Sequence, residues 1–277
     1  MDDLKVAAVS MHSHPGDIPR NLERIASFVE AAARRGADMI CFPELSVTGY
    51  RIIPSKEDFA GRTVTGALEA LSRMARDTGM VVMAGLMEPS ETGKPYITQV
   101  VAIPGKPLGR YRKTHLSPVE CAGFRAGTEI GVFRSGNTVF GVALCYEAHF
   151  PEISTLLCLK GSEILFIPHA SPRGDPETKL ASWLRHLTAR AFDNGAYVVA
   201  CNPVDEGEAG LTFPGAAVVL GPDGHVLARY TGNEEKILFA SLEDRILREI
   251  RAHRMKYFLP HRRPELYKDL VSPAPEK

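Results

Sequence analysis

Four times along the chain, a helix-like pattern ends at a glycine and a continuously apolar run follows at once. A helix C-terminus favours a residue with left-handed backbone geometry, which glycine adopts without steric cost. A run that is apolar throughout is typical of a strand covered on both faces. The junctions therefore predict an α/β fold with mixed sheets buried under helices. The glycines are Gly36, Gly79, Gly161 and Gly195, and the predicted strands are Met39 to Phe42, Met80 to Gly85, Ile164 to Ile167 and Tyr197 to Cys201.

The segments before the first two glycines have the spacing of one apolar helix face. Apolar residues recur three and four positions apart, as in an amphipathic helix. Hairpin-like pieces with turn residues at their centres lie elsewhere, around Ser135 to Asn137 and around Pro222 to Gly224. No linker rich in Gly, Ser or Pro divides the chain, so we expect a single domain over residues 1–277. The last six residues, 272–277, are expected to fray. The helix-face residues are Leu22, Ile25, Val29 and Ala32, then Leu68, Leu71 and Ala75.

Composition narrows the class of partner. The chain has 277 residues, of which 44% are hydrophobic, and its 33 Lys and Arg balance its 33 Asp and Glu. With no net charge, nothing electrostatic recruits nucleic acid or an anionic membrane. No apolar run approaches the roughly 18 residues of a membrane span, and the N-terminus lacks the pattern of a signal peptide. We therefore expect a cytoplasmic protein whose partner is a small molecule or another protein, with no nucleic acid and no membrane.

The cysteines and histidines do not form a recognisable metal or disulfide pattern. The five cysteines are odd in number, scattered and free of CxxC spacing, which argues against a disulfide framework and a zinc site. His12 and His14 have a spacing compatible with a metal, but no carboxylate cluster lies near them. We predict no metal.

Cys145 occupies a position that suits a nucleophile. It follows the apolar run Val139 to Leu144, and the segment Phe150-Pro151-Glu152 then opens a helix. A thiol between a strand end and a helix N-terminus experiences the positive end of the helix dipole, and nearby N–H groups can bind an oxyanion. The alternative is that Cys145 is the last buried residue of a core strand. We expect Cys41, Cys158 and Cys201 to be buried, whereas Cys121 in a loop is undecided.

A cysteine nucleophile requires a base and a cation, and two other strand ends supply them. Glu44 follows the strand that ends at Phe42, and its apolar neighbours indicate partial burial, which raises a carboxyl pKa toward the range useful for proton transfer. Lys113, in GRYRKTHL, is the candidate cation. Taken alone, Glu44 reads as an exposed cap and Lys113 as a solvated loop residue.

Together these stretches resemble the nitrilase superfamily of carbon–nitrogen hydrolases, in its amidase and carbamoylase branch. The resemblance spans nearly the whole chain, since it extends to RAFDNGAYVVACN (Arg190 to Asn202) and RRPELY (Arg262 to Tyr267). Glu120 matches the second glutamate that family members place beside the lysine, although a loop salt bridge explains it equally. The motifs, in the family's order, are FPELSVTGY with Glu44, YRKTHL with Lys113 and LCYEAHFPE with Cys145.

The resemblance implies a four-layer α-β-β-α sandwich, in which two mixed sheets lie face to face with helices outside. It also implies a homodimer or a higher homo-oligomer, and no metal or organic cofactor. Family members often extend a C-terminal tail onto the partner subunit. Residues 247–277, which are dense in Arg and His, are the candidate tail.

The candidate groups define a mechanism. Glu44 takes the proton of Cys145 as the sulfur attacks an amide-type carbon, and Lys113 with the N–H of Tyr146 stabilises the oxyanion. Glu44 then protonates the leaving ammonia or amine. A thioester remains, and water activated by Glu44 hydrolyses it.

The substrate is less defined by the sequence. True nitrilases of the superfamily tend to carry Trp-Glu after the cysteine, so Tyr146-Glu147 favours an amide or N-carbamoyl substrate over a nitrile. Arg173 is a candidate for binding a substrate carboxylate or, equally, a solvated loop residue. Tyr50, Tyr146 and His149 are the other candidate substrate-binding residues. An ω-amidase, an N-carbamoyl hydrolase and an aliphatic amidase all remain open, and a nitrilase is the alternative enzyme.

Two rival hypotheses use the same residues differently. A papain-like Cys–His pair would draw on His115, His149 or His169, but it leaves the glutamate and lysine motifs unexplained. The chain could instead be a catalytically idle scaffold or ligand-binding member of the superfamily. The three intact polar groups count against that reading.

Overall fold

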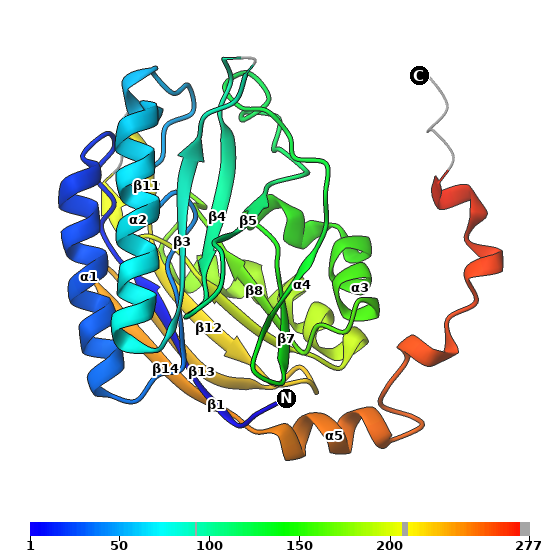
Figure 1. The fold of residues 1–277 in the computed structure, drawn as a ribbon. Helices are drawn as coiled ribbons and strands as arrows, with labels where there is room; N and C mark the ends of the chain where they lie inside the picture. Colours follow the sequence, from blue (N-terminus) through cyan, green and yellow to red (C-terminus); the bar gives the residue numbers. More distant parts are fainter. Residues whose placement is uncertain (92, 207–209, 272–277) are drawn as a thin grey trace.

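The computed structural model describes residues 1–91, 93–206 and 210–271. Two six-stranded sheets lie face to face, with helices on the outer surface of each (Figure 1). This arrangement confirms the predicted four-layer α-β-β-α sandwich. A separate two-stranded ribbon joins β10 (Asp205–Glu206) to β11 (Thr212–Phe213).

The first sheet has the strand order β14-β1-β2-β3-β4-β5. Its β1-β2-β3 portion is parallel, and the strands on both sides of that portion pair antiparallel. Residues of α1 and α2 pack against its outer face in one apolar cluster. The bounds are β1 (Leu4–Ser10), α1 (Ile18–Arg34), β2 (Met39–Cys41), α2 (Gly61–Thr78), β3 (Val81–Glu88), β4 (Tyr96–Ala102), β5 (Gly109–Arg112) and β14 (Lys236–Leu242).

The second sheet has the order β13-β12-β9-β8-β7-β6, with a parallel centre formed by β7, β8 and β9. Helices α3 and α4 cover its outer face. Both predicted hairpins are present, as the antiparallel pairs β6–β7 and β12–β13. The bounds are β6 (Val132–Ser135), β7 (Thr138–Val142), α3 (Pro151–Leu159), β8 (Ile164–Pro168), α4 (Pro176–Asn194), β9 (Tyr197–Cys201), β12 (Gly215–Leu220) and β13 (Val226–Gly232).

The alternation of side chains along each strand divides the apolar core into three layers. In β1, Val6 and Ala8 face the second sheet, whereas Ala7 and Val9 face the helices. Both faces of the strand are buried because successive side chains point in opposite directions. This explains why the inner strands read as continuously apolar in the sequence.

The four junction glycines have the predicted backbone geometry. Gly36, Gly79, Gly161 and Gly195 have φ of 68°, 71°, 95° and 54°, all in the left-handed region. Each lets a helix end within a few residues of the next strand. The junctions therefore set how the helices lie on the sheets.

The C-terminal segment leaves the body later than the predicted tail begins. Helix α5 (Asp244–Ala252) buries Leu247 and Ile250, and Leu259 is still buried beyond it. The short 3-10 helices that follow form an arm that stands away from the sandwich (Figure 1). Residues 272–277, predicted to fray, lie outside the described part. The arm contains the 3-10 helices Pro264–Leu266 and Lys268–Val271, and a third 3-10 helix, Leu259–His261, lies between α5 and the arm.

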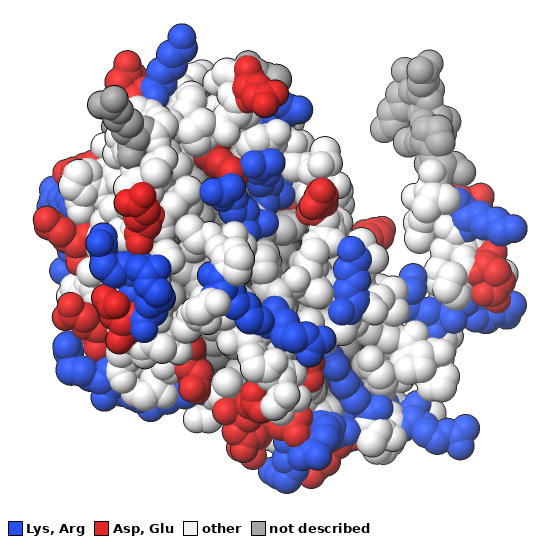
Figure 2. All heavy atoms as spheres, in the orientation of Figure 1, with Lys and Arg blue, Asp and Glu red and all other residues white. Residues whose placement is uncertain are grey.

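The surface carries charges of both signs in small neighbouring groups. Figure 2 shows lysine and arginine interspersed with aspartate and glutamate over the visible face. This distribution fits the zero formal charge of the chain. None of the helices within the described residues is long and apolar enough to cross a bilayer.

Candidate active site

Glu44 lies in the turns that follow β2, inside the sandwich. Its side chain is fully buried, and its backbone N–H donates to the carbonyl of His169, 3.1 Å away. The next residue, Leu45, has a φ of 57°, which is unusual for a branched side chain. Gly85 on β3 makes room for this turn, because a Cβ there would lie 2.3 Å from the nitrogen of Leu45. Burial and close packing fix the carboxylate in place.

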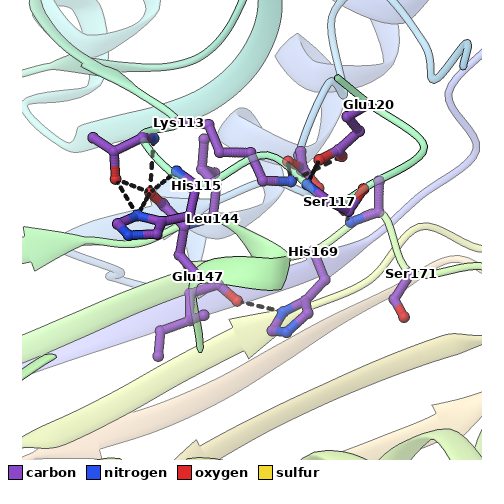
Figure 3. Close-up of polar contacts among 12 residues, drawn as sticks. Lys113, His115, Ser117, Glu120, Leu144, Glu147, His169 and Ser171 are labelled. Carbon is purple, nitrogen blue, oxygen red and sulfur yellow. Dashed lines mark hydrogen bonds and ion pairs between the residues drawn. The ribbon is translucent and has the colours of Figure 1, made fainter. Parts of the chain in front are cut away.

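Lys113 follows β5 and is completely buried. Its ammonium donates to Oε1 of Glu44 and to Oε1 of Glu120, each at 2.8 Å. The other oxygen of Glu120 accepts the N–H of Ser117 at 2.7 Å (Figure 3). The structure thus brings three sequence-predicted residues into one buried carboxylate–ammonium–carboxylate group. Lys113 is not the solvated loop residue that its neighbours alone suggested.

Cys145 begins a five-residue 3-10 helix, Cys145–His149, that separates β7 from α3. Cys145 thus lies between the end of β7 and a helix that begins at Pro151, as expected from the sequence, and the intervening 3-10 helix was not anticipated. Its φ is 45°, a strained value for a residue with a Cβ. Such strain persists only where the surrounding structure holds it, and it is concentrated at functional sites.

Glu147 holds the cysteine turn against the lysine loop, a role that the sequence did not reveal. Its carboxylate accepts hydrogen bonds from the N–H of Leu144 at 2.7 Å and from the N–H of Thr114 at 2.8 Å. The hydroxyl of Tyr111 donates to it at 2.8 Å. Glu147 and Leu144 are labelled in Figure 3. The only sequence signal was an acidic residue two positions after the cysteine.

Burial and mutual contacts shift the pKa values of Glu44, Cys145 and Lys113. Burial raises the pKa of Glu44 to about 7, although the Lys113 ammonium opposes the shift. Burial and the Glu44 carboxylate raise the pKa of the Cys145 thiol to about 12, so the resting sulfur is protonated. The pKa of Lys113 is raised by Glu44 and Cys145 despite the opposing effect of burial, which keeps its charge. A base with a pKa near 7 is suited to general catalysis at neutral pH.

A cavity of about 210 Å³ opens beside Cys145 and Glu120. Three of the candidate substrate-binding residues, Tyr50, Tyr146 and His149, line it. Arg173 does not: it is exposed, with a φ of 73°, and its backbone N–H donates to the carbonyl of Thr212.

Three histidines also border the cavity, but each is held neutral by its surroundings. Burial lowers the pKa of His149, lowers that of His186 to about 4, and lowers that of His169 well below its usual value. His169 stacks on Trp183 with ring centroids 4.1 Å apart, and His149 lies 4.4 Å from His186. The remaining candidate of the papain-like hypothesis, His115, is partly exposed and stacks on Phe150. The Glu44 carboxylate, in contact with Lys113, is thus the better placed candidate base.

Ser171, Lys179 and Trp183 are among the lining residues that the sequence did not single out. Ser171 follows β8, while Lys179 and Trp183 lie on α4. From the segment after β8, the sequence offered His169 for a papain-like pair and Arg173 as a substrate ligand. The apolar spacing of α4 gave no reason to single out Lys179 or Trp183.

The family model for carbon–nitrogen hydrolases matches residues 5–252. Among curated proteins, the nitrilase of Pyrococcus abyssi is 30% identical over 95% of this chain and 99% of its own length. The ω-amidase of Xenopus tropicalis is 30% identical over 83% of this chain and 86% of its own. The N-carbamoylputrescine amidase of Solanum tuberosum is 28% identical over 92% of this chain and 91% of its own. The relatives thus share the family but differ in substrate.

A solved structure shows the same architecture with a trapped nucleophile. A variant of the amidase from Nesterenkonia sp. AN1 matches with a TM-score of 0.82 and 28% sequence identity, covering 97% of both chains. In that protein, the acetamide moiety of fluoroacetamide is covalently attached to the active-site cysteine. The family match, the fold and the related amidases agree with the resemblance inferred from sequence. The chain therefore belongs to the carbon–nitrogen hydrolase family, as an amidase-type enzyme with a cysteine nucleophile.

Proposed function

We propose that Cys145 is the nucleophile of this enzyme, that Glu44 is its general base and acid, and that Lys113 binds the oxyanion. The observation that carries the proposal is the contact of Lys113 with Glu44 and Glu120 beside a cavity lined by Cys145. A buried ammonium and two buried carboxylates cost folding free energy unless they are paired. Their position next to the thiol of Cys145, a residue with a strained backbone, supports a catalytic role.

In the first half-reaction, the sulfur forms a bond to the substrate carbonyl carbon as its proton passes to Glu44. The Glu44 carboxylate is one reason that the thiol pKa is high, so moving the proton to Glu44 removes that penalty. The thiolate then faces the Lys113 ammonium. The tetrahedral oxyanion is stabilised by Lys113 and by the N–H of Tyr146, which has no intrahelical acceptor in the first turn of its 3-10 helix. The C–N bond breaks, and the leaving nitrogen takes the proton from Glu44.

In the second half-reaction, water replaces the amine. Glu44, again a carboxylate, accepts a proton from water as the oxygen attacks the thioester carbon. The C–S bond breaks, the carboxylic acid leaves, and the sulfur recovers its proton from Glu44. Glu120 holds Lys113 in place throughout and makes no bond to the reacting atoms.

The dimensions of the cavity support a small linear substrate. Its volume of about 210 Å³ lies below the ~300–1,000 Å³ of pockets that hold drug-sized ligands. Tyr50 is a neutral phenol at all ordinary pH values, since burial and Glu120 raise its pKa, and it is a donor that can orient a substrate. Short amides and N-carbamoyl compounds fit this volume.

Ammonia release from a panel of monoamides, N-carbamoyl compounds and short nitriles tests the proposal. We expect amide turnover by the wild type and loss of at least about 10⁴-fold in kcat for Cys145→Ala. Cys121→Ser, at an exposed cysteine outside the cavity, is the control and should keep the wild-type rate. Iodoacetamide should label Cys145 and block turnover. Full activity in Cys145→Ala, or turnover of nitriles alone, would contradict the assignment.

We also propose that the chain forms a homodimer or larger homo-oligomer in the cytoplasm. Apolar side chains are exposed on α3 and on the C-terminal arm, including Leu156, Leu159, Leu266 and Leu270. Of these, Leu156, Leu159 and Leu270 border a groove of about 500 Å³ between α3 and the arm. A second copy would cover this surface. The five cysteines are free thiols, which supports a reducing compartment.

A further inference from the structure

Lys179 is the one lysine or arginine among the described residues that line the cavity. It lies in the first turn and a half of α4, and its side chain is partly buried. The ammonium donates to Oγ of Ser171 and to the carbonyl of Pro172, each at 2.9 Å. Ser171 follows His169 in the segment that borders the cavity (Figure 3). The charge of Lys179 is therefore held at the cavity wall by two fixed acceptors.

Both acceptors are neutral, which leaves the charge uncompensated. Within the described part of the chain, no carboxylate forms an ion pair with Lys179, in contrast to Lys113, which has two. Burial lowers the pKa of Lys179, and the adjacent N-terminus of α4 carries a partial positive charge that also disfavours a cation. A cation in such a place costs folding free energy. An anionic ligand that pairs with Lys179 would offset this cost.

The ammonium also has an unused donor. A lysine has three N–H groups, and Lys179 donates two of them to Ser171 and Pro172. Elsewhere on the wall, His149, His169 and His186 are neutral because their pKa values are lowered. The other charged residue on the wall, Glu120, is paired with Lys113. The free positive charge of the cavity is thus concentrated at Lys179.

We propose that Lys179 binds a carboxylate at the end of the substrate opposite the scissile amide. The inference rests on the proposed function and narrows its substrate to monoamides of short dicarboxylic acids. The third N–H of Lys179 donates to the carboxylate, and the paired charges offset each other's desolvation. The same ammonium repels a substrate that ends in an amine, so the site discriminates by charge as well as by size. Arg173, the sequence-based candidate, stays outside the cavity.

Three amides of equal chain length and different charge test the inference. They are glutaramate, which ends in a carboxylate, 5-oxohexanamide, which ends in a neutral ketone, and 5-aminopentanamide, which ends in an ammonium. We expect the wild type to rank them in that order by kcat/KM. In Lys179→Met the ratio of glutaramate to 5-oxohexanamide should fall about 10- to 100-fold, the effect of losing one charged hydrogen bond. Lys179→Arg should restore part of the ratio.

Two control variants separate this role from others. Lys160→Met removes an exposed lysine that donates to the carbonyl of Ile130, and it should leave the ratio unchanged. Arg173→Met tests the competing residue. An equal fall for all three amides in Lys179→Met would assign Lys179 to loop structure or to the thiolate and would overturn the inference. So would a loss of the ratio in Arg173→Met alone.

A binding measurement keeps the inference testable apart from turnover. Calorimetry with Cys145→Ala should show tighter binding of glutaramate than of 5-oxohexanamide, and the added Lys179→Met change should remove the difference. If the wild type hydrolyses the amides without this preference, the proposed function stands and the role of Lys179 fails. If no amide is hydrolysed but the binding difference is found, the role of Lys179 stands and the proposed function fails.

Discussion

The carboxylate of Glu44 and the ammonium of Lys113 lie 2.8 Å apart, although 69 positions separate them in the sequence and neither side chain is exposed. Each changes the chemistry of the other. Lys113 lowers a Glu44 pKa that burial would otherwise raise further, and Glu44 keeps Lys113 charged. The pair therefore holds a base that titrates near neutrality next to a permanent cation. Its consequences can be measured.

The rate should depend on pH through Glu44. The mechanism requires the carboxylate form, and the pKa of Glu44 is about 7, so kcat/KM should rise with pH and level off above about pH 7. Ionisation of the Cys145 thiol does not change kcat/KM in this pH range, because the pKa of the thiol is about 12. Glu44→Gln should lower kcat about 10²- to 10⁴-fold and remove the rise of kcat/KM with pH. A rise that persists in Glu44→Gln would mean that another group titrates in this range.

Lys113→Met should lose the oxyanion cation, with a fall of about 10²- to 10³-fold in kcat. The attraction that lowers the pKa of Glu44 is also lost, so any residual activity should have its acid limb at higher pH. Leaving two buried carboxylates without a partner should destabilise the fold by about 3–5 kcal/mol. Chemical denaturation and the pH–rate profile measure both effects. Lys106→Met, at an exposed lysine, is the matched control, and an unshifted limb would argue against the coupling.

Glu147→Gln tests whether the carboxylate positions the cysteine turn. The amide has the same shape but replaces one acceptor by a donor, which then faces the N–H of Leu144 or the N–H of Thr114. We expect a loss of about 1–3 kcal/mol in the free energy of unfolding and slower alkylation of Cys145. Glu69→Gln, on the exposed face of α2, should change neither. Wild-type alkylation in a destabilised Glu147→Gln would limit Glu147 to a structural role.

Gly85→Ala should damage the site without touching a reacting group. The added Cβ would lie 2.3 Å from the nitrogen of Leu45 and 3.0 Å from the carbonyl carbon of Glu44, so the turn that carries Glu44 must shift. A displaced base should lower kcat more than it raises KM. Gly66→Ala on α2 meets nothing within 4 Å and should stabilise the fold by up to about 1 kcal/mol. Normal kcat in Gly85→Ala would show that Glu44 tolerates movement.

The proposed homo-oligomer depends on the C-terminal arm. The double variant Leu266→Asp and Leu270→Asp places charges on its exposed apolar side chains, so it should dissociate the assembly to monomers in light scattering. Leu227→Asp, at an exposed leucine of β13, should leave the assembly intact. An unchanged mass in the double variant would place the interface elsewhere.

The sequence by itself determined the layers of the fold and the identity of the three reactive groups. Helix ends at Gly36, Gly79, Gly161 and Gly195 and fully apolar strands are local signals, because glycine conformation and residue periodicity depend on near neighbours. The motifs around Glu44, Lys113 and Cys145 were recognisable for the same reason, since each is a short continuous stretch. The strand bounds differ from the expected ones by a few residues at most, as at β3, which continues to Glu88.

The tertiary structure decided what surrounds those groups. Lys113 reads as a solvated loop residue and Arg173 as a candidate ligand until folding buries the first and leaves the second exposed. Lys179 and Glu147 acquire their roles from segments far away in the sequence. A pKa, an unpaired charge or a free N–H depends on every group within a few ångströms, and only packing brings those groups together.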